Sequence, residues 1–112
     1  MKRVLSTFSL VVAFALITVP VAQGAGDAKA GKDVYAKKCA TCHGQQGEGN
    51  PTIANTLKIE FKHLGSSEVQ AKTDDQLKKI VVEGEGKMKP VKDMDAKAIE
   101  DVTAFVRTLK KK

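Results

Sequence analysis

Cys39-Ala40-Thr41-Cys42-His43 is the stretch that decides the interpretation of this sequence. It holds both cysteines of the chain, and a histidine directly follows the second one. A disulfide between Cys39 and Cys42 would close a loop of only four residues, which removes little entropy from the unfolded chain. The spacing therefore needs a chemical explanation rather than a stabilising one.

The C-x-x-C-H spacing is typical of covalent haem attachment. Two thiols one helical turn apart can add to the two vinyl groups on one edge of a porphyrin, and the next imidazole then lies where it reaches the iron. The sequence therefore predicts one covalently bound haem c, held through thioether bonds at Cys39 and Cys42. His43 is predicted to be the proximal iron ligand.

Two other readings of the cysteine pair are weaker. A thioredoxin-like redox pair belongs in a βαβ setting, and no strand period occurs in this sequence. A zinc site could combine the motif with His63, but adjacent Cys42 and His43 fit poorly in one tetrahedral shell. The second half of a zinc-binding pattern is also missing.

The start of the chain predicts export. Met1-Lys2-Arg3 is basic, residues 10–19 form an apolar stretch, and small residues stand at Ala22 and Gly24. This pattern is typical of a signal peptide over residues 1–24, cleaved after Gly24. The alternative is an uncleaved membrane anchor, but the stretch is shorter than the roughly 18 apolar residues of a spanning helix. We expect a periplasmic protein with no stable membrane insertion after cleavage, which agrees with haem attachment outside the cytoplasm.

The mature domain, residues 25–112, is small. Cleavage leaves 88 residues, lowers the formal charge from +6 to +4, and leaves Tyr35, Phe61 and Phe105 as the aromatic residues. Domains of this size often depend on a disulfide, a metal or a cofactor for a sufficient core. The modest charge of an exported protein also argues against nucleic acid as a partner.

The apolar periodicity predicts an all-α fold with three main helices, short turns and long loops. The first helix begins at the N-cap Asp27 and runs to about residue 38. The second begins with a capping box at Thr73 and Gln76 and ends at Gly84, and the third begins after Asp95. A short turn is expected over residues 53–57. Loops this long in a small domain indicate a chain that wraps around something.

The mature chain resembles the class I c-type cytochromes in their small bacterial form. Four segments carry the resemblance, in order: Ala30 to Tyr35; the haem motif with Gly44, Gly47 and Gly49; Gly84 to Pro90; and the last helix with Phe105. The resemblance implies a cytochrome c fold in which the first and last helices cross at Gly31 and Tyr35 against Phe105. It also implies that the Pro51 carbonyl accepts a hydrogen bond from the His43 ring. The family usually has Met followed directly by Pro, whereas Lys89 intervenes here.

Met88 is the predicted distal iron ligand. Met94 has a structural role instead, because it precedes the Asp95 cap and can form a hydrophobic staple with Ile99. Met88 stands in a glycine-rich loop between two lysines, where an apolar side chain lacks another destination. His63 is the rival, and bis-histidine ligation would give a lower redox potential than His/Met ligation.

An iron with six ligands has no open position for a substrate, so the predicted function is single-electron transfer rather than catalysis. Lysines beside both ligand motifs predict docking to redox-partner proteins with acidic surfaces: Lys37, Lys38, Lys87 and Lys89. We expect a monomer. Two alternatives remain open: a peroxidase-like enzyme or gas sensor if Met88 does not bind, or a cytochrome subunit of a larger oxidoreductase.

Overall fold

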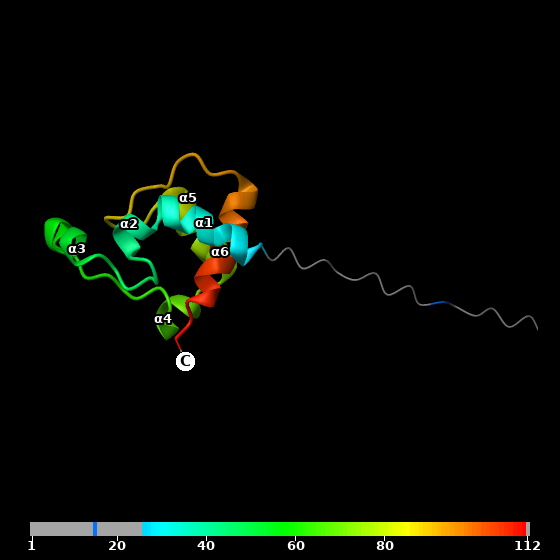
Figure 1. The fold of residues 1–112 in the computed structure, drawn as a ribbon, viewed down its shortest axis with the longest axis horizontal. Helices are drawn as coiled ribbons and strands as arrows, with labels where there is room; N and C mark the ends of the chain where they lie inside the picture. The colour runs from blue at the N-terminus through cyan, green and yellow to red at the C-terminus, as the bar shows by residue number, and fades with distance from the viewer. Residues whose placement is uncertain (1–14, 16–25, 112) are drawn as a thin grey trace, which may run out of the picture.

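The structure is a computed structural model that describes residues 15 and 26–111. Apart from residue 15, the predicted signal peptide lies outside the described residues. The described part of the chain folds into six helices, which long connections join (Figure 1). In chain order they are α1 (Ala28–Lys38), α2 (Ala40–His43), α3 (Pro51–Leu57), α4 (Ser67–Gln70), α5 (Asp74–Glu83) and α6 (Ala96–Thr108).

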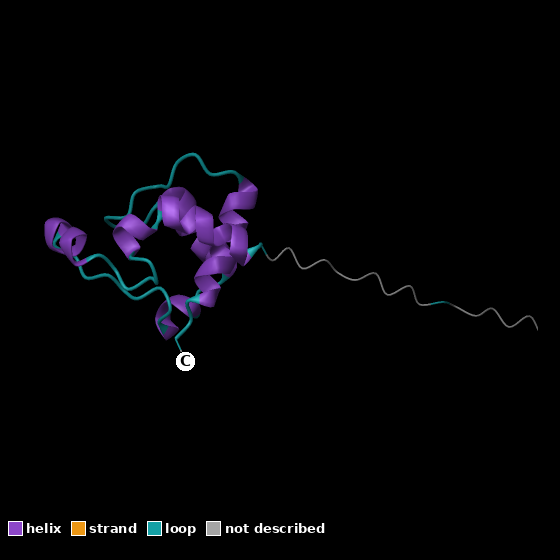
Figure 2. Cartoon of the chain, viewed as in Figure 1, coloured by secondary structure: helices purple, strands orange, loops and turns teal. Residues whose placement is uncertain are grey.

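The all-α prediction is confirmed for the described residues. Figure 2 shows helices joined by long connections and no strand among them. The nearest approach to a sheet is one isolated antiparallel bridge between Glu85 and Met88. The three predicted helices correspond to α1, α5 and α6, whereas α2 and α4 add two short helices. The expected turn over residues 53–57 is the longer helix α3, with Pro51 in its first turn.

Side-chain caps explain where the three main helices begin. The Asp27 carboxylate accepts from the first turn of α1, and the Asp95 carboxylate accepts from Ala98 N–H at 2.7 Å in α6. The Thr73 hydroxyl and the Gln76 amide form the reciprocal capping box of α5, with bonds of 3.1 and 2.8 Å. Each cap satisfies N–H groups that a helix start leaves without intrahelical partners. The predicted helix starts are therefore correct.

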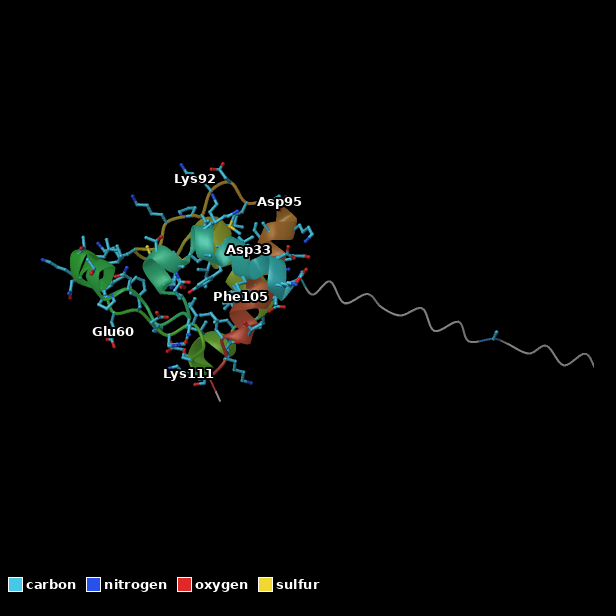
Figure 3. The ribbon with its side chains drawn as sticks, in the orientation of Figure 1. Asp33, Glu60, Lys92, Asp95, Phe105 and Lys111 are labelled. Atoms are coloured by element: carbon cyan, nitrogen blue, oxygen red, sulfur yellow. The ribbon has the colours of Figure 1, made fainter. Side chains whose placement is uncertain are left out.

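The tightest packing is where α1 crosses α6. A Cβ on Gly31 would overlap the backbone carbonyl of Asp101, so only glycine permits this approach. The Tyr35 and Phe105 rings pack beside it, with centroids 5.0 Å apart and planes tilted by 52°. Figure 3 labels Phe105 on α6. The crossing implied by the family resemblance is confirmed.

The fully enclosed apolar side chains are few and lie mostly at this crossing. Among the described residues, the buried hydrophobic side chains are Tyr35, Val69 and Val102. The side chains of Phe61, Leu64 and Met88 are only half-buried. Side-chain packing is therefore concentrated at the α1–α6 crossing and is much looser around the connections.

Both ends of the folded body are fastened to it. At the first end, the Asp27 N–H donates to the buried carboxylate of Asp101 at 2.8 Å. At the other end, the Lys111 N–H donates to the Gly65 carbonyl at 2.9 Å. The Arg107 guanidinium adds bonds from α6 to the segment between α4 and α5, including one of 2.6 Å to the Lys72 carbonyl. These bonds place the loops relative to α6.

Candidate haem-binding site

The cysteine motif consists of the single-turn helix α2 and its N-cap residue, Cys39. The chain breaks from α1 at Cys39, where φ is −123° and ψ is −38°. The Cys39 carbonyl then accepts from the His43 N–H at 2.9 Å, and Gly44 ends the turn at φ 77°. Both cysteines are free, Cys39 half-buried and Cys42 exposed. The turn therefore presents two thiols and an imidazole together.

In its described part, the structure gathers no further metal ligands around the cysteine motif. Burial and the neighbouring Cys42 raise the pKa of the Cys39 thiol to about 11. Within residues 15 and 26–111, no group of three or more histidine, cysteine or acidic side chains is placed to hold a metal ion. The zinc alternative is therefore not supported.

The His43 imidazole lies in a half-buried position. Burial lowers its pKa, so the ring is held in the neutral form that a metal needs. Its Nδ1 is buried and has no hydrogen-bond partner among the described residues. The hydrogen bond that the His43 ring was expected to donate to the Pro51 carbonyl is therefore absent, and that expectation is wrong. Pro51 is instead the first residue of α3, and the carbonyls of a helix's first turn accept intrahelical bonds.

Phe61 lies against the His43 ring. The two ring centroids are 5.4 Å apart and the planes meet at 64°, an edge-to-face arrangement. The sequence showed Phe61 only as one of three aromatic residues in the mature domain, and 18 positions separate it from His43. No local pattern indicates such a contact, so the sequence analysis missed it.

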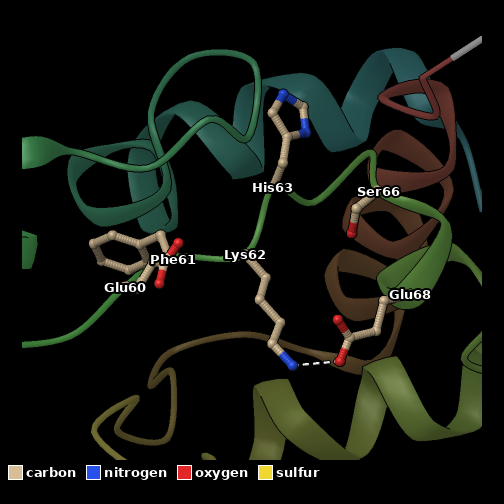
Figure 4. A pocket seen from close by; sticks show the side chains of 6 residues that line it. All are labelled: Glu60, Phe61, Lys62, His63, Ser66 and Glu68. Carbon is tan, nitrogen blue, oxygen red and sulfur yellow. Dashed lines mark hydrogen bonds and ion pairs between the residues drawn. The ribbon is translucent and has the colours of Figure 1, made fainter.

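Phe61 also lines an open pocket. The pocket has a volume of about 410 Å³ and is lined by Glu60, Phe61, Lys62, His63, Ser66 and Glu68. Figure 4 shows the Lys62–Glu68 ion pair at the bottom of the view, the Phe61 ring at the left and the His63 ring at the top. Phe61 therefore contributes both to this pocket and to the contact with the His43 ring.

His63 has a structural role in this region. Its Nδ1 accepts the Gly65 N–H at 2.9 Å, and Gly65 packs closely on the end of α6. This bond holds the turn that leads into α4. The rival distal ligand therefore uses one ring nitrogen to shape the backbone.

Met88 lies in the connection between α5 and α6. Paired backbone bonds of 2.9 Å join Met88 to Glu85, and the side chain is half-buried. Gly84 makes this turn possible, because it has φ +78° and a Cβ there would overlap the Met88 carbonyl. A bond of 2.9 Å from Val91 N–H to the Val81 carbonyl fastens the segment to α5. Met88 is therefore on a tightly shaped loop.

The four predicted docking lysines are exposed. Lys37 and Lys38 form the last turn of α1, and Lys87 and Lys89 flank Met88. None of the four takes part in an ion pair within the described part of the chain. Their charges are therefore not offset by a bound carboxylate there.

An all-helical fold with a C-x-x-C-H turn beside an α1–α6 crossing defines the class of small c-type cytochromes. Residues 26–106 match the family described as cytochrome c oxidase, cbb3-type, subunit III. The chain belongs to this cytochrome c family.

Individual proteins agree with this assignment. Cytochrome c6 of Rippkaea orientalis (strain PCC 8801 / RF-1) is 37% identical over 111 residues, covering 95% of this chain and 92% of the relative. Cytochrome c-554(547) of Halothiobacillus neapolitanus is 31% identical over 91 residues, covering 77% of this chain and 100% of the relative. The solved structure of the KustC0563 c-type cytochrome superimposes with a TM-score of 0.61 at 26% identity. The superposition covers 72% of this chain and 98% of the KustC0563 chain.

These relationships establish the general function. The chain is a small electron-transfer cytochrome rather than an enzyme, and its cofactor is haem c, which contains iron. In the part of the chain that the structure describes, no helix has the length and apolar character needed to span a membrane.

Proposed function

We propose that the mature chain is a periplasmic monohaem electron carrier, with haem c bound through Cys39 and Cys42 and iron bound by His43 and Met88. The observation that carries the proposal is the α2 turn, which brings two free thiols and a neutral, half-buried imidazole together. These groups fit haem c, because thiols supply the thioether sulfurs and a neutral imidazole supplies an iron ligand.

The two proposed ligands suit electron transfer. Bound haem supplies the one-electron change at iron. His43 and Met88 contribute neutral nitrogen and sulfur donors, and neither has to gain or lose a proton when the charge changes. A thioether ligand raises the potential relative to bis-histidine ligation. We therefore expect a positive midpoint potential.

Met88 and Met94 form a matched pair for testing the distal ligand. Both side chains are half-buried, but Met94 precedes the cap of α6 while Met88 lies in the α5–α6 connection. Met88→Ala should abolish the long-wavelength charge-transfer band of methionine-ligated ferric haem and lower the potential. Met94→Ala should keep both properties and lose stability only. An unchanged charge-transfer band in Met88→Ala would mean that Met88 is not the iron ligand.

Mass spectrometry tests whether Cys39 and Cys42 attach the haem. The mature exported protein should carry the mass of one haem that denaturation does not release. Replacing Cys39 or Cys42 with serine should leave one thioether, and replacing both should leave none. Wild-type protein with two unmodified thiols would overturn the proposal. The same spectrum gives the mature N-terminus, so it also tests cleavage after Gly24.

The four exposed lysines support docking to acidic partners. Long-range attraction speeds the encounter of opposite charges and fades with salt. Reduction by ferrocyanide, a highly negative complex, should slow several-fold in Lys87→Gln/Lys89→Gln at low salt. The exposed pair Lys110 and Lys111 at the end of the chain provides the control. Equal slowing in Lys110→Gln/Lys111→Gln would show that net charge, not the lysines beside Met88, governs the rate.

One observation favours a second candidate. The matching family is described as a subunit of a cytochrome c oxidase, so this chain could work as a fixed subunit of a larger oxidoreductase. Size-exclusion chromatography of periplasmic extract separates the two cases. A free carrier elutes as a haem-containing monomer, and a subunit elutes with its complex.

A further inference from the structure

We infer that Phe61 is a positioning residue for the iron-binding imidazole, and that its ring sets the plane of the His43 ring. The inference rests on the proposed role of His43 as an iron ligand. It concerns a residue far away in the sequence that belongs to neither ligand motif. Phe61 would act on the iron only through the imidazole.

The first argument is the environment of the imidazole. The second nitrogen of a metal-binding histidine normally donates to a carboxylate, a carbonyl or water, and this bond fixes the ring. In the described residues, the buried Nδ1 of His43 has no such partner. The Phe61 ring is the aromatic group that contacts it, at a centroid distance of 5.4 Å and 64°. Edge-to-face packing therefore restrains the ring where a hydrogen bond usually does.

The second argument is that Phe61 is itself held in place. Gly49 has φ +87°, and a Cβ there would stand 2.6 Å from the Phe61 Cβ, so the two backbones approach closely. The Gly49 N–H donates to the His43 carbonyl at 2.7 Å, which ties the same glycine to the haem motif. On the other side of Phe61, the Leu64 N–H donates to the Gly47 carbonyl at 2.9 Å. The segment that carries the phenyl ring therefore packs on Gly49 and is hydrogen-bonded to Gly47, both in the loop that directly follows the motif.

Removing the phenyl ring should free the imidazole to rotate. The torsion about the Cβ–Cγ bond of histidine is broad, so packing decides the angle within that range. The plane of an axial imidazole determines which iron orbitals it overlaps. A change in that plane appears in ferric electron paramagnetic resonance and in the order of the haem methyl signals in the proton NMR spectrum.

Holoprotein variants test the inference. Phe61→Leu should change the ferric g-values and reorder the haem methyl signals, whereas Phe61→Tyr keeps a ring and should retain the wild-type pattern. Phe105→Leu is the matched control, because it makes the same chemical change at the α1–α6 crossing. It should lower the midpoint of denaturation and leave both spectra unchanged.

A second variant covers the case in which Phe61→Leu yields no holoprotein. Gly49→Ala pushes against the Phe61 Cβ and should shift the same signals. Wild-type spectra in Phe61→Leu, or in Gly49→Ala if it is the variant measured, would overturn the inference. So would equal changes in Phe61→Tyr. A wild-type holoprotein without histidine ligation would instead overturn the proposed function before any variant is compared.

Discussion

The α1–α6 crossing and the haem-motif segment, residues 39–64, are held together in different ways. At the crossing, Tyr35 and Val102 are both only 2% exposed, and the helices meet without intervening space at Gly31. In the haem-motif segment, glycines with positive φ and backbone hydrogen bonds set the shape, and Leu57 is 38% exposed. The crossing is stabilised by side-chain packing, whereas we expect the haem-motif segment to depend on its cofactor for apolar contacts.

Tyr35 connects the two regions. Its ring packs on Phe105 at the crossing, and its hydroxyl donates to the Gly44 carbonyl at 2.5 Å, directly after the haem motif. Burial is the main cause that raises the pKa of this phenol to about 12. One side chain therefore contributes apolar packing to the first region and a hydrogen bond to the second.

Loss of the haem should have the largest effect on the stability of the two regions. Cys39→Ser/Cys42→Ser should lower the free energy of unfolding by more than about 5 kcal/mol, a range that single side-chain changes seldom reach. Hydrogen exchange should show residues 44–64 losing protection first, while α1 and α6 keep more of theirs. Equal loss of protection in both regions would mean that the crossing also requires the cofactor.

Gly31→Ala should be the next largest effect. Alanine normally stabilises a helix by about 1 kcal/mol relative to glycine. Here the added Cβ overlaps the Asp101 carbonyl, and backbone cannot rotate away, so we expect a net loss of about 2 kcal/mol. Chemical denaturation of the holoprotein measures this loss. The exposed neighbour supplies the control, since Lys32→Ala should stay within about 0.5 kcal/mol.

Tyr35→Phe should have a smaller effect, and it separates the contribution of the ring from that of the hydroxyl. It keeps the ring at the crossing and removes the bond to Gly44, which should cost about 1 kcal/mol. The raised pKa adds an alkaline signature. In wild type the stabilisation is complete below about pH 10, the unfolded pKa, and is lost as the pH rises towards 12. Stability curves against pH should show this component in wild type and lack it in Tyr35→Phe.

The smallest expected effect on stability appears only at acidic pH. The Lys97 ammonium, at 2.7 Å, is the main cause that lowers the pKa of Asp101, and the Asp27 N–H adds to it. A lowered pKa gives stabilisation that is present above about pH 4, the unfolded value, and is lost as the pH falls through the folded value. The stability gap between wild type and Asp101→Asn should therefore narrow below pH 4. A stability difference between wild type and Asp101→Asn that does not change with pH would mean that the charge of Asp101 does not contribute to stability.

Local chemistry made much of the fold predictable. Asp27, Thr73 and Asp95 are N-caps whose hydrogen bonds reach only two or three residues along the chain. Their capping role can therefore be predicted from the neighbouring residues in the sequence. The C-x-x-C-H turn is likewise contained in five consecutive residues. The helix crossing was expected from the family resemblance and is present. Local signals therefore located the main helices and the motif.

Contacts between distant segments were not predictable in the same way. Helix α4 has four residues, too few for an apolar period, although Ser66 caps it. The contact of Phe61 with His43 depends on Gly47 and Gly49 adopting φ of +80° and +87°. No rule of spacing specifies where such turns send the chain. The expected hydrogen bond from the His43 ring to Pro51 was wrong for a different reason, because α3 begins at that residue.

The fastening of both ends has a consequence for anything joined to this domain. Asp27 is tied to Asp101 and Lys111 to Gly65, so neither end of the body acts as a free arm. A tag, lipid anchor or second domain attached there starts from a fixed point. Its reach is then set by the length and stiffness of its own linker.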